Sequence, residues 1–93
     1  MHYNLGNALY LMELIDEAIH HYRAAISMNP KKSESFYNLG NALCVKNDYH
    51  NAIQSYLQAL DIDPKNAPAL YNLGNAYYMM NRYEEAIKVY VKA

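Results

Sequence analysis

Asparagine side chains recur at fixed intervals and form the most regular set of hydrogen-bonding groups in the chain. They make two series with a spacing of 34 residues: Asn4, Asn38 and Asn72, and Asn7, Asn41 and Asn75. An asparagine amide offers both donors and an acceptor. A row of such amides can pair with the N–H and C=O groups of an extended peptide without reading its side chains. The spacing therefore predicts a surface that recognises a peptide backbone.

Tyrosine is the unusual residue of the composition, because it occurs 11 times while Phe occurs once and Trp is absent. Phenol rings add flat contact area at low entropic cost and carry one polar tip. Five tyrosines are predicted to border the asparagine series: Tyr3, Tyr10, Tyr37, Tyr71 and Tyr78. The other six are predicted to pack in the core: Tyr22, Tyr49, Tyr56, Tyr77, Tyr83 and Tyr90. A purely structural role for both the bordering tyrosines and the asparagines remains the alternative.

Residue sets for catalysis or metal binding are not found in the sequence. His20 and His21 are adjacent, so on a helix their side chains point about 100° apart and do not easily share a metal. Cys44 lies in the next repeat. No glycine-rich phosphate loop and no nucleophile–base spacing occur. We therefore predict no enzymatic activity, no metal site and no cofactor.

Charge and hydropathy narrow the class of partner. The net charge is −1 and the isoelectric point is near 6.4, which argues against a nucleic-acid partner, because such a partner needs a basic face. No apolar run approaches the roughly 18 residues of a membrane span, and no secretory signal is visible. The single cysteine forms no internal disulfide and fits a reducing compartment. We expect a protein or peptide partner, no membrane association and a cytoplasmic location.

The asparagines belong to an internal repeat. The string Tyr-Asn-Leu-Gly-Asn-Ala occurs at 3–8, 37–42 and 71–76, and all three glycines of the chain lie in it. The repeats are 1–32, 33–66 and 67–93, in one domain. Helical periodicity predicts two helices and no strand in each repeat. If the repeated glycine is counted as position 8 of a 34-residue unit, the two helices cover about positions 1–14 and 17–30. Asn47 and Asn81 lie at the turn between the two helices, where a left-handed residue is useful.

Other residues agree with these helix boundaries. The first repeat carries Glu13 and Leu14 at the turn, which are poorer turn residues. Asn66 is placed to cap the first helix of the third repeat, and Pro68 is tolerated in the first turn of that helix.

This pattern resembles the tetratricopeptide repeat. The middle repeat carries the residues of the family pattern: Phe36, Leu39, Gly40, Leu43, Ala52, Tyr56, Ala59 and Pro64. The resemblance covers the whole chain and implies an all-α, right-handed superhelix of antiparallel helix pairs. It also implies that the asparagine face lines the inner, concave curve and binds protein segments. We expect an extended, weakly charged peptide there.

One known use of the family is excluded by the residues present. The carboxylate clamp that holds the C-terminal tail of heat-shock chaperones requires cations at three positions of the repeats. This chain has Tyr3, Pro68 and Asn72 at those positions. We therefore predict that it is not such a clamp.

An excised or engineered array without a dedicated ligand is the alternative function, because the three repeats are unusually alike. In that case the two open ends of the stack are expected to associate into a homo-oligomer. The residues involved would be Met1, Leu5, Ala8 and Met12 at one end, and Ile87, Tyr90 and Ala93 at the other.

Overall fold

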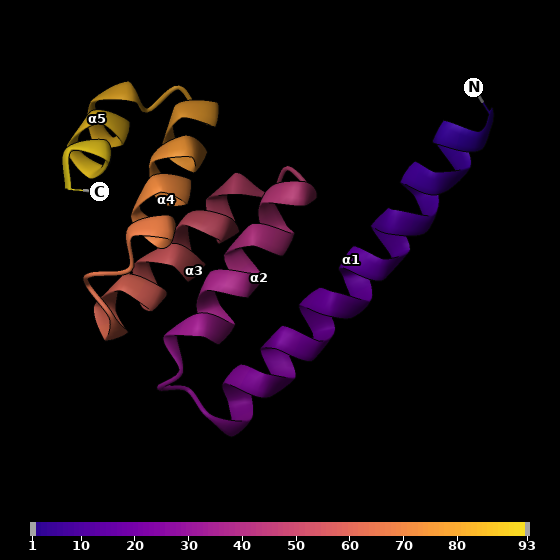
Figure 1. Cartoon of the computed structure of the whole chain (residues 1–93), viewed down its shortest axis with the longest axis horizontal. Helices are drawn as coiled ribbons and strands as arrows, with labels where there is room; N and C mark the ends of the chain where they lie inside the picture. Colours follow the sequence, from indigo (N-terminus) through magenta and orange to yellow (C-terminus); the bar gives the residue numbers. More distant parts are fainter. Residues whose placement is uncertain (1, 93) are drawn as a thin grey trace.

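The protein is an all-α solenoid of stacked antiparallel helices. The computed structural model describes residues 2–92, and the side chains of residues 13–92. The helices are α1 (His2–Met28), α2 (Ser33–Val45), α3 (Tyr49–Ile62), α4 (Ala67–Met79) and α5 (Tyr83–Lys92). Helices α2 and α3 form one antiparallel pair and α4 and α5 the next, as Figure 1 shows. The predicted helix pairs of the second and third repeats are confirmed.

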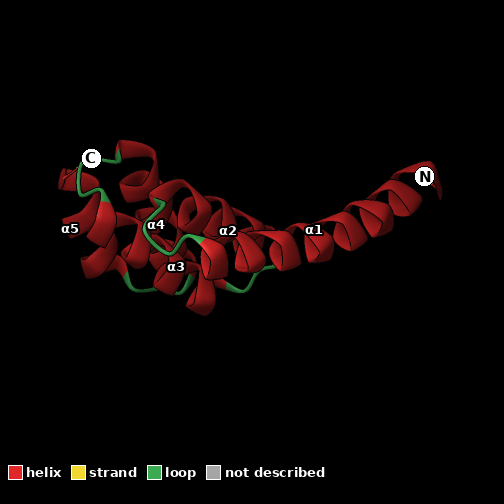
Figure 2. Ribbon diagram, turned by 90° about the horizontal axis from the view of Figure 1, so that it is seen from below, coloured by secondary structure: helices red, strands yellow, loops and turns green. Residues whose placement is uncertain are grey.

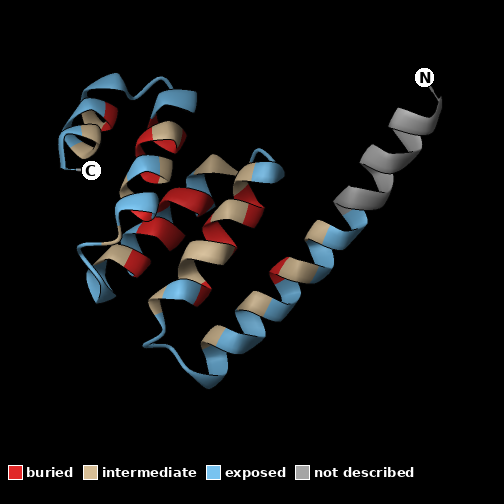
Figure 3. Cartoon of the chain, in the orientation of Figure 1, coloured by how far each residue is buried: buried red, intermediate tan, exposed pale blue. Residues whose placement is uncertain are grey.

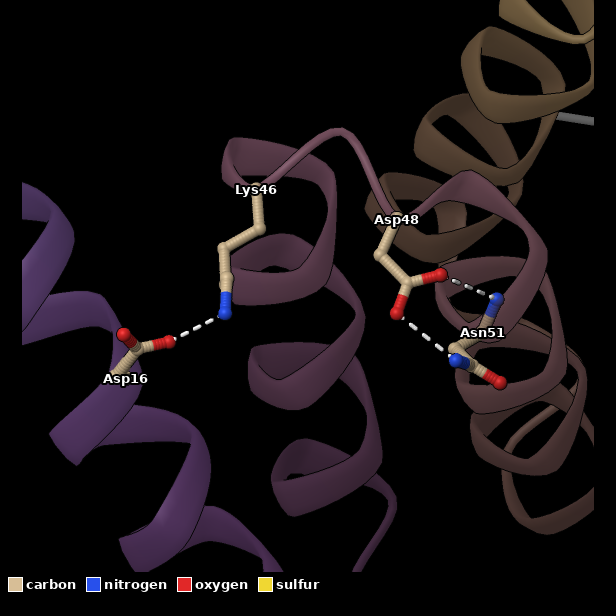
Figure 4. A network of polar contacts seen from close by, with 4 residues as sticks. All are labelled: Asp16, Lys46, Asp48 and Asn51. Carbon is tan, nitrogen blue, oxygen red and sulfur yellow. Dashed lines mark hydrogen bonds and ion pairs between the residues drawn. The ribbon is translucent and has the colours of Figure 1, made fainter.

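The turns within these two pairs depend on the predicted asparagines. Asn47 has φ 62° and Asn81 has φ 61°, the left-handed conformation that asparagine adopts more readily than other side chains. Asp48 then caps α3, because its carboxylate accepts hydrogen bonds from the backbone and side-chain nitrogens of Asn51 (Figure 4). Asn66 caps α4 by accepting from the backbone nitrogen of Ala69, as predicted.

The prediction of a helix pair in the first repeat is wrong, because α1 runs without interruption from His2 to Met28. Glu13 stands where the other repeats have Asn47 and Asn81, and a left-handed residue of this kind costs about 1–2 kcal/mol. Leu14 replaces the capping Asp48 and offers no acceptor. Both residues favour helix. Consequently the first half of α1 extends away from the other helices, as Figure 2 shows.

The second half of α1 holds the helix against α2. Ile19 is buried there, while Tyr22 and Ile26 are partly buried against the same core. The ammonium group of Lys46 at the end of α2 lies 2.5 Å from a carboxylate oxygen of Asp16 (Figure 4). Such a solvent-exposed ion pair contributes at most about 1 kcal/mol, so the apolar contacts dominate this attachment.

Two glycines let the paired helices approach closely, as the repeat pattern predicts. A Cβ atom at Gly40 would lie 2.6 Å from the ring of Tyr56, and one at Gly74 would meet the ring of Tyr90 in the same way. Tyr56 is 1% exposed, and Figure 3 shows that the buried residues gather in α2, α3 and α4. The middle of the stack is therefore its best-packed part.

Within residues 2–92, no helix combines the length and the apolar character that crossing a bilayer requires.

Candidate functional site

Helices α2 and α4 lie side by side and present the repeated polar residues on one surface, which we call the asparagine face. Its described members are Tyr37, Asn38, Asn41, Tyr71, Asn72, Asn75 and Tyr78. None of these side chains is fully buried. None carries a formal charge at neutral pH. Tyr3, Asn4, Asn7 and Tyr10, which the sequence assigns to the same face, lie outside the residues whose side chains are described.

A continuous chain of hydrogen bonds links the asparagines of neighbouring repeats. The hydroxyl of Tyr56 donates to Oδ1 of Asn41 at 2.5 Å. The side-chain nitrogen of Asn72 donates to the same oxygen at 3.0 Å and to the hydroxyl oxygen of Tyr37 at 3.3 Å. These bonds fix the orientation of both amides. The asparagines therefore have a structural role in joining one repeat to the next.

The third repeat repeats part of this geometry. The hydroxyl of Tyr90 donates to Oδ1 of Asn75 at 2.5 Å, as Tyr56 does to Asn41. The rings of Tyr71 and Tyr90 lie 5.9 Å apart, and those of Tyr37 and Tyr56 lie 6.2 Å apart. The arrangement is thus a property of the repeat unit and not of one position.

The orientation of the amides leaves specific groups unused. Asn41 uses its oxygen twice, and among the described residues its side-chain nitrogen has no protein partner. Asn72 uses both hydrogens of its nitrogen, and within the same residues its oxygen has no protein partner. A free N–H donor and a free C=O acceptor therefore lie on adjacent helices. This pair matches the acceptor and donor of a peptide backbone.

A shallow hollow of about 220 Å³ lies between α2 and α4 on this face. Asn41, Cys44, Tyr56 and Asn72 are among its lining residues. The sulfur of Cys44 lies 3.6 Å from the hydroxyl of Tyr56. Burial raises the pKa of the Cys44 thiol and that of the Tyr56 phenol, so both groups are neutral at physiological pH. The hollow is therefore uncharged.

The exposed tyrosines form the border of the face. Tyr71 is 58% exposed and Tyr78 is 57% exposed, whereas Tyr37 is half-buried. Tyr83, which the sequence analysis assigns to the core, is 50% exposed, so that prediction is wrong. Its ring instead packs at the edge of Tyr78 with ring centres 5.2 Å apart, because it is the first residue of α5 and borders the exposed turn. The remaining tyrosines predicted as core are buried or partly buried: Tyr22, Tyr49, Tyr56, Tyr77 and Tyr90.

The hydroxyl of Tyr56 is the functional group that sequence reasoning missed. Its ring is in the core as predicted, yet its oxygen reaches the floor of the asparagine face. The signal for this role was the presence of Tyr, and not Phe, at 22, 56 and 90.

A second surface lies on the other side of α4. The largest of the described cavities, about 470 Å³, is found there between α3, α4 and α5. Leu57, Leu60 and Leu70 line it together with Lys88 and Lys92. It has no repeated polar pattern, and the corresponding cavity one repeat earlier is smaller and more polar. Within residues 13–92 no three His, Cys, Asp or Glu side chains gather as metal ligands.

Comparisons with known sequences agree with the repeat geometry. A family model described as TPR repeat matches residues 40–81, and two described as Tetratricopeptide repeat match residues 1–32 and 21–54. A search of the curated proteins found no match.

Solved structures share the same arrangement of helices. MamA superposes with a TM-score of 0.84 at 27% identity, over 95% of this chain and 52% of the MamA chain. The Sgt2 TPR domain from Aspergillus fumigatus gives 0.82 at 28% identity, over 96% of this chain and 59% of that one. The second TPR of Spaghetti (RPAP3), bound to the HSP90 peptide SRMEEVD, gives 0.83 at 20% identity, over 96% and 82%. The chain thus spans about half the length of MamA and somewhat more of the Sgt2 domain.

Proposed function

The chain belongs to the tetratricopeptide repeat family, and from this premise we propose that it is a protein-interaction module whose asparagine face holds an extended, weakly charged peptide. The family is typically one of binding modules without catalytic activity, and we propose the same for this protein. In this proposal the asparagine face lines the inner curve of the superhelix, where a bound segment would contact both α2 and α4.

The observation that carries this proposal is the free donor–acceptor pair on adjacent helices. The side-chain nitrogen of Asn41 would donate to a peptide carbonyl, and the oxygen of Asn72 would accept from a peptide N–H. Because Tyr56 holds Asn41 in place, the donor is oriented before the peptide arrives. Such preorganisation reduces the entropy lost on binding.

The spacing of the repeats supports an extended ligand. Helices that touch through short side chains lie about 8–10 Å apart. An extended chain advances about 10 Å in three residues. The asparagine pairs of successive repeats would therefore contact every third residue of the peptide. The exposed rings of Tyr71 and Tyr78 would pack on its side chains.

The charge of the face indicates which peptides are favoured. The peptide in the RPAP3 structure, SRMEEVD, carries three acidic residues. The present chain offers Pro68 and Asn72 at two positions that would require cations, and no described residue of the asparagine face is charged. Burying an acidic side chain against neutral groups costs free energy unless it is paired. We therefore propose neutral segments as ligands and not acidic chaperone tails.

The test is a titration of a peptide selected from a library on the whole chain. Asn41→Asp keeps an acceptor for Tyr56 and Asn72 but replaces the free N–H donors with a carboxylate oxygen. We expect at least a tenfold loss of peptide affinity, about 1.4 kcal/mol, with little change in folding stability. Leu57→Asp in the cavity on the other side of α4 is the control and should leave affinity unchanged. If Asn41→Asp binds normally while Leu57→Asp does not, the binding site lies in that cavity.

A self-associating array without a dedicated ligand is the second candidate, and one observation favours it. The apolar residues Ile87 and Val91 of α5 are 61% and 80% exposed, which would suit an end-to-end contact. Of the other residues predicted for that contact, Tyr90 is half-buried. The rest lie outside the described side chains: Met1, Leu5, Ala8, Met12 and Ala93. Failure of every library peptide to bind would favour this candidate.

A further inference from the structure

The continuous helix α1 separates two residues whose equivalents touch each other in the other two repeats. In those repeats a glycine packs against a tyrosine of the following helix, as Gly40 does against Tyr56. The equivalent residues of the first repeat are Gly6 and Tyr22, and both lie on the continuous helix α1. Sixteen residues of helix separate them by about 24 Å along the axis. Gly6 therefore does not reach Tyr22 of its own chain.

The surface that this contact would cover is present but open. Tyr56 and Ala59 of the second repeat are 1% and 0% exposed under α2. Their equivalents in the first repeat, Tyr22 and Ala25, are half-buried and exposed. The second half of α1 thus carries an open apolar surface around Tyr22 and Ala25, which we call the bed. Its shape suits a packed helix, but α1 itself is straight and does not fold back onto it.

A comparison of two equivalent hollows indicates which helix would cover the bed. The hollow of about 220 Å³ between α2 and α4 has one wall made by Asn41 and Cys44. The hollow one repeat earlier, about 230 Å³, is lined by the equivalent residues of α1 and α2, among them Ile15 and Tyr22. The repeat assigns the missing wall of this second hollow to Asn7 and Tyr10.

We infer that two copies of this chain exchange the first halves of their α1 helices, so that residues 2–12 of each copy lie on the open bed of the other. The occupant is indicated by the repeat itself. The string Tyr-Asn-Leu-Gly-Asn-Ala lies in α2 and α4, which are paired with α3 and α5, and the third copy of this string is residues 3–8. Gly6 of one copy would pack against Tyr22 of the second copy.

The exchange follows from the straightness of α1. Glu13 and Leu14 keep the helix continuous where Asn47 and Asp48 form a turn in the second repeat. Exchange of an identical element is a low-cost route to a dimer, and the contact proposed for Gly6 is one that Gly40 and Gly74 already make in the other repeats. The dimer would also place Asn7 of the second copy beside Asn38, which extends the asparagine face by one repeat. This inference does not depend on peptide binding.

Sedimentation velocity of the whole chain from micromolar to millimolar concentration tests the exchange. We expect a species of twice 10.7 kDa to accumulate. Glu13→Asn combined with Leu14→Asp gives the first repeat the turn of the second repeat, so residues 2–12 can fold back on their own bed. This variant should raise the dimer dissociation constant at least about tenfold. Gly6→Leu leaves the hinge unchanged and should raise it as well, because the new side chain would meet Tyr22 of the second copy.

Ile87→Glu is the matched control, because it blocks an end-to-end contact through α5 and leaves α1 intact. The dimer should persist in this variant. A wild-type chain that remains monomeric at millimolar concentration overturns the inference. So does a dimer that survives both the turn variant and Gly6→Leu, or one that Ile87→Glu dissociates. Circular dichroism at each concentration verifies that every variant keeps its helix content.

Discussion

The hydroxyl of Tyr56 lies 2.5 Å from Oδ1 of Asn41 and donates its hydrogen to that oxygen. Tyr56 comes from the buried helix α3 and Asn41 from the exposed side of α2, so this bond connects the core to the asparagine face. Asn72 of the next repeat shares the same oxygen. The orientation of these amides therefore depends on the packing of Tyr56 in the core.

Asn41→Ala should destabilise the protein more than Asn72→Ala. The first change leaves the buried hydroxyl of Tyr56 without its acceptor, which costs about 1–3 kcal/mol. The second change removes one donor and leaves Asn41 bonded to Tyr56, so the expected cost is about 0.5–1.5 kcal/mol. Urea unfolding followed by circular dichroism measures both. Equal losses would show that the shared oxygen is not the central acceptor.

Gly40→Ala should cost more stability than Gly74→Ala. Each new methyl group meets a tyrosine ring, but Tyr56 is 1% exposed and enclosed, whereas Tyr90 is half-buried on the terminal helix α5 and can move. Overpacking at Gly40 is expected to cost about 1–3 kcal/mol, offset in part by the better helix propensity of alanine. Thermal unfolding of the two variants measures the difference. A larger loss at Gly74 contradicts the packing described.

Asn47→Glu places in the second repeat the residue that the first repeat has at its turn. Because position 47 has φ 62°, the glutamate should cost about 1–2 kcal/mol of folding free energy. Asn47→Gly is the control, since glycine adopts this conformation without steric cost. Should Asn47→Glu prove as stable as the glycine variant, Glu13 does not explain the continuous α1.

The stability of the protein should fall in alkaline solution. Burial, with Cys44 and Tyr37 nearby, raises the pKa of Tyr56 above that of an unfolded tyrosine, which is about 10. A group whose pKa is raised by folding stabilises the folded state fully below its unfolded pKa and loses this effect as the pH rises further. We therefore expect the free energy of unfolding to decrease above about pH 10.

Tyr56→Phe supplies the control for this pH dependence. Its free energy of unfolding should fall less steeply at high pH, because one raised phenol is absent, while Tyr77 and Tyr90 still contribute in the same direction. Urea titrations at a series of alkaline pH values make the comparison. Parallel curves for the wild type and Tyr56→Phe would exclude Tyr56 as a cause.

Much of the fold could be predicted from the sequence because the same pattern of residue types occurs three times. The glycine contacts, the left-handed Asn47 and Asn81 and the cap at Asn66 could all be predicted from residue type and spacing. The continuous α1 could not, because a family pattern is carried over to every repeat even where Glu13 and Leu14 do not suit its turn. At this point the helix continues because Glu13 and Leu14 both favour helix and provide neither a left-handed residue nor a capping acceptor.

The composition of the candidate site could also be predicted, but its hydrogen bonding could not. Spacing places Asn41 and Asn72 on one face, yet which amide atoms are used and which are free depends on side-chain torsions. Periodicity predicts that Tyr56 lies in the core, because it describes where a side chain points and not how far its hydroxyl reaches. Tyr83 was misplaced because its position at the start of α5 leaves one side of its ring open.

¹⁵N NMR of the side-chain amide groups during titration with a selected peptide shows directly whether the asparagine face binds the peptide. We expect the Nδ2 signals of Asn41 and Asn72 to move progressively with peptide concentration, while the backbone signals of Leu57 and Val89, which line the cavity on the other side of α4, stay fixed. Side-chain amide signals that remain unchanged at saturation, with shifts confined to Leu57 and Val89, would contradict it.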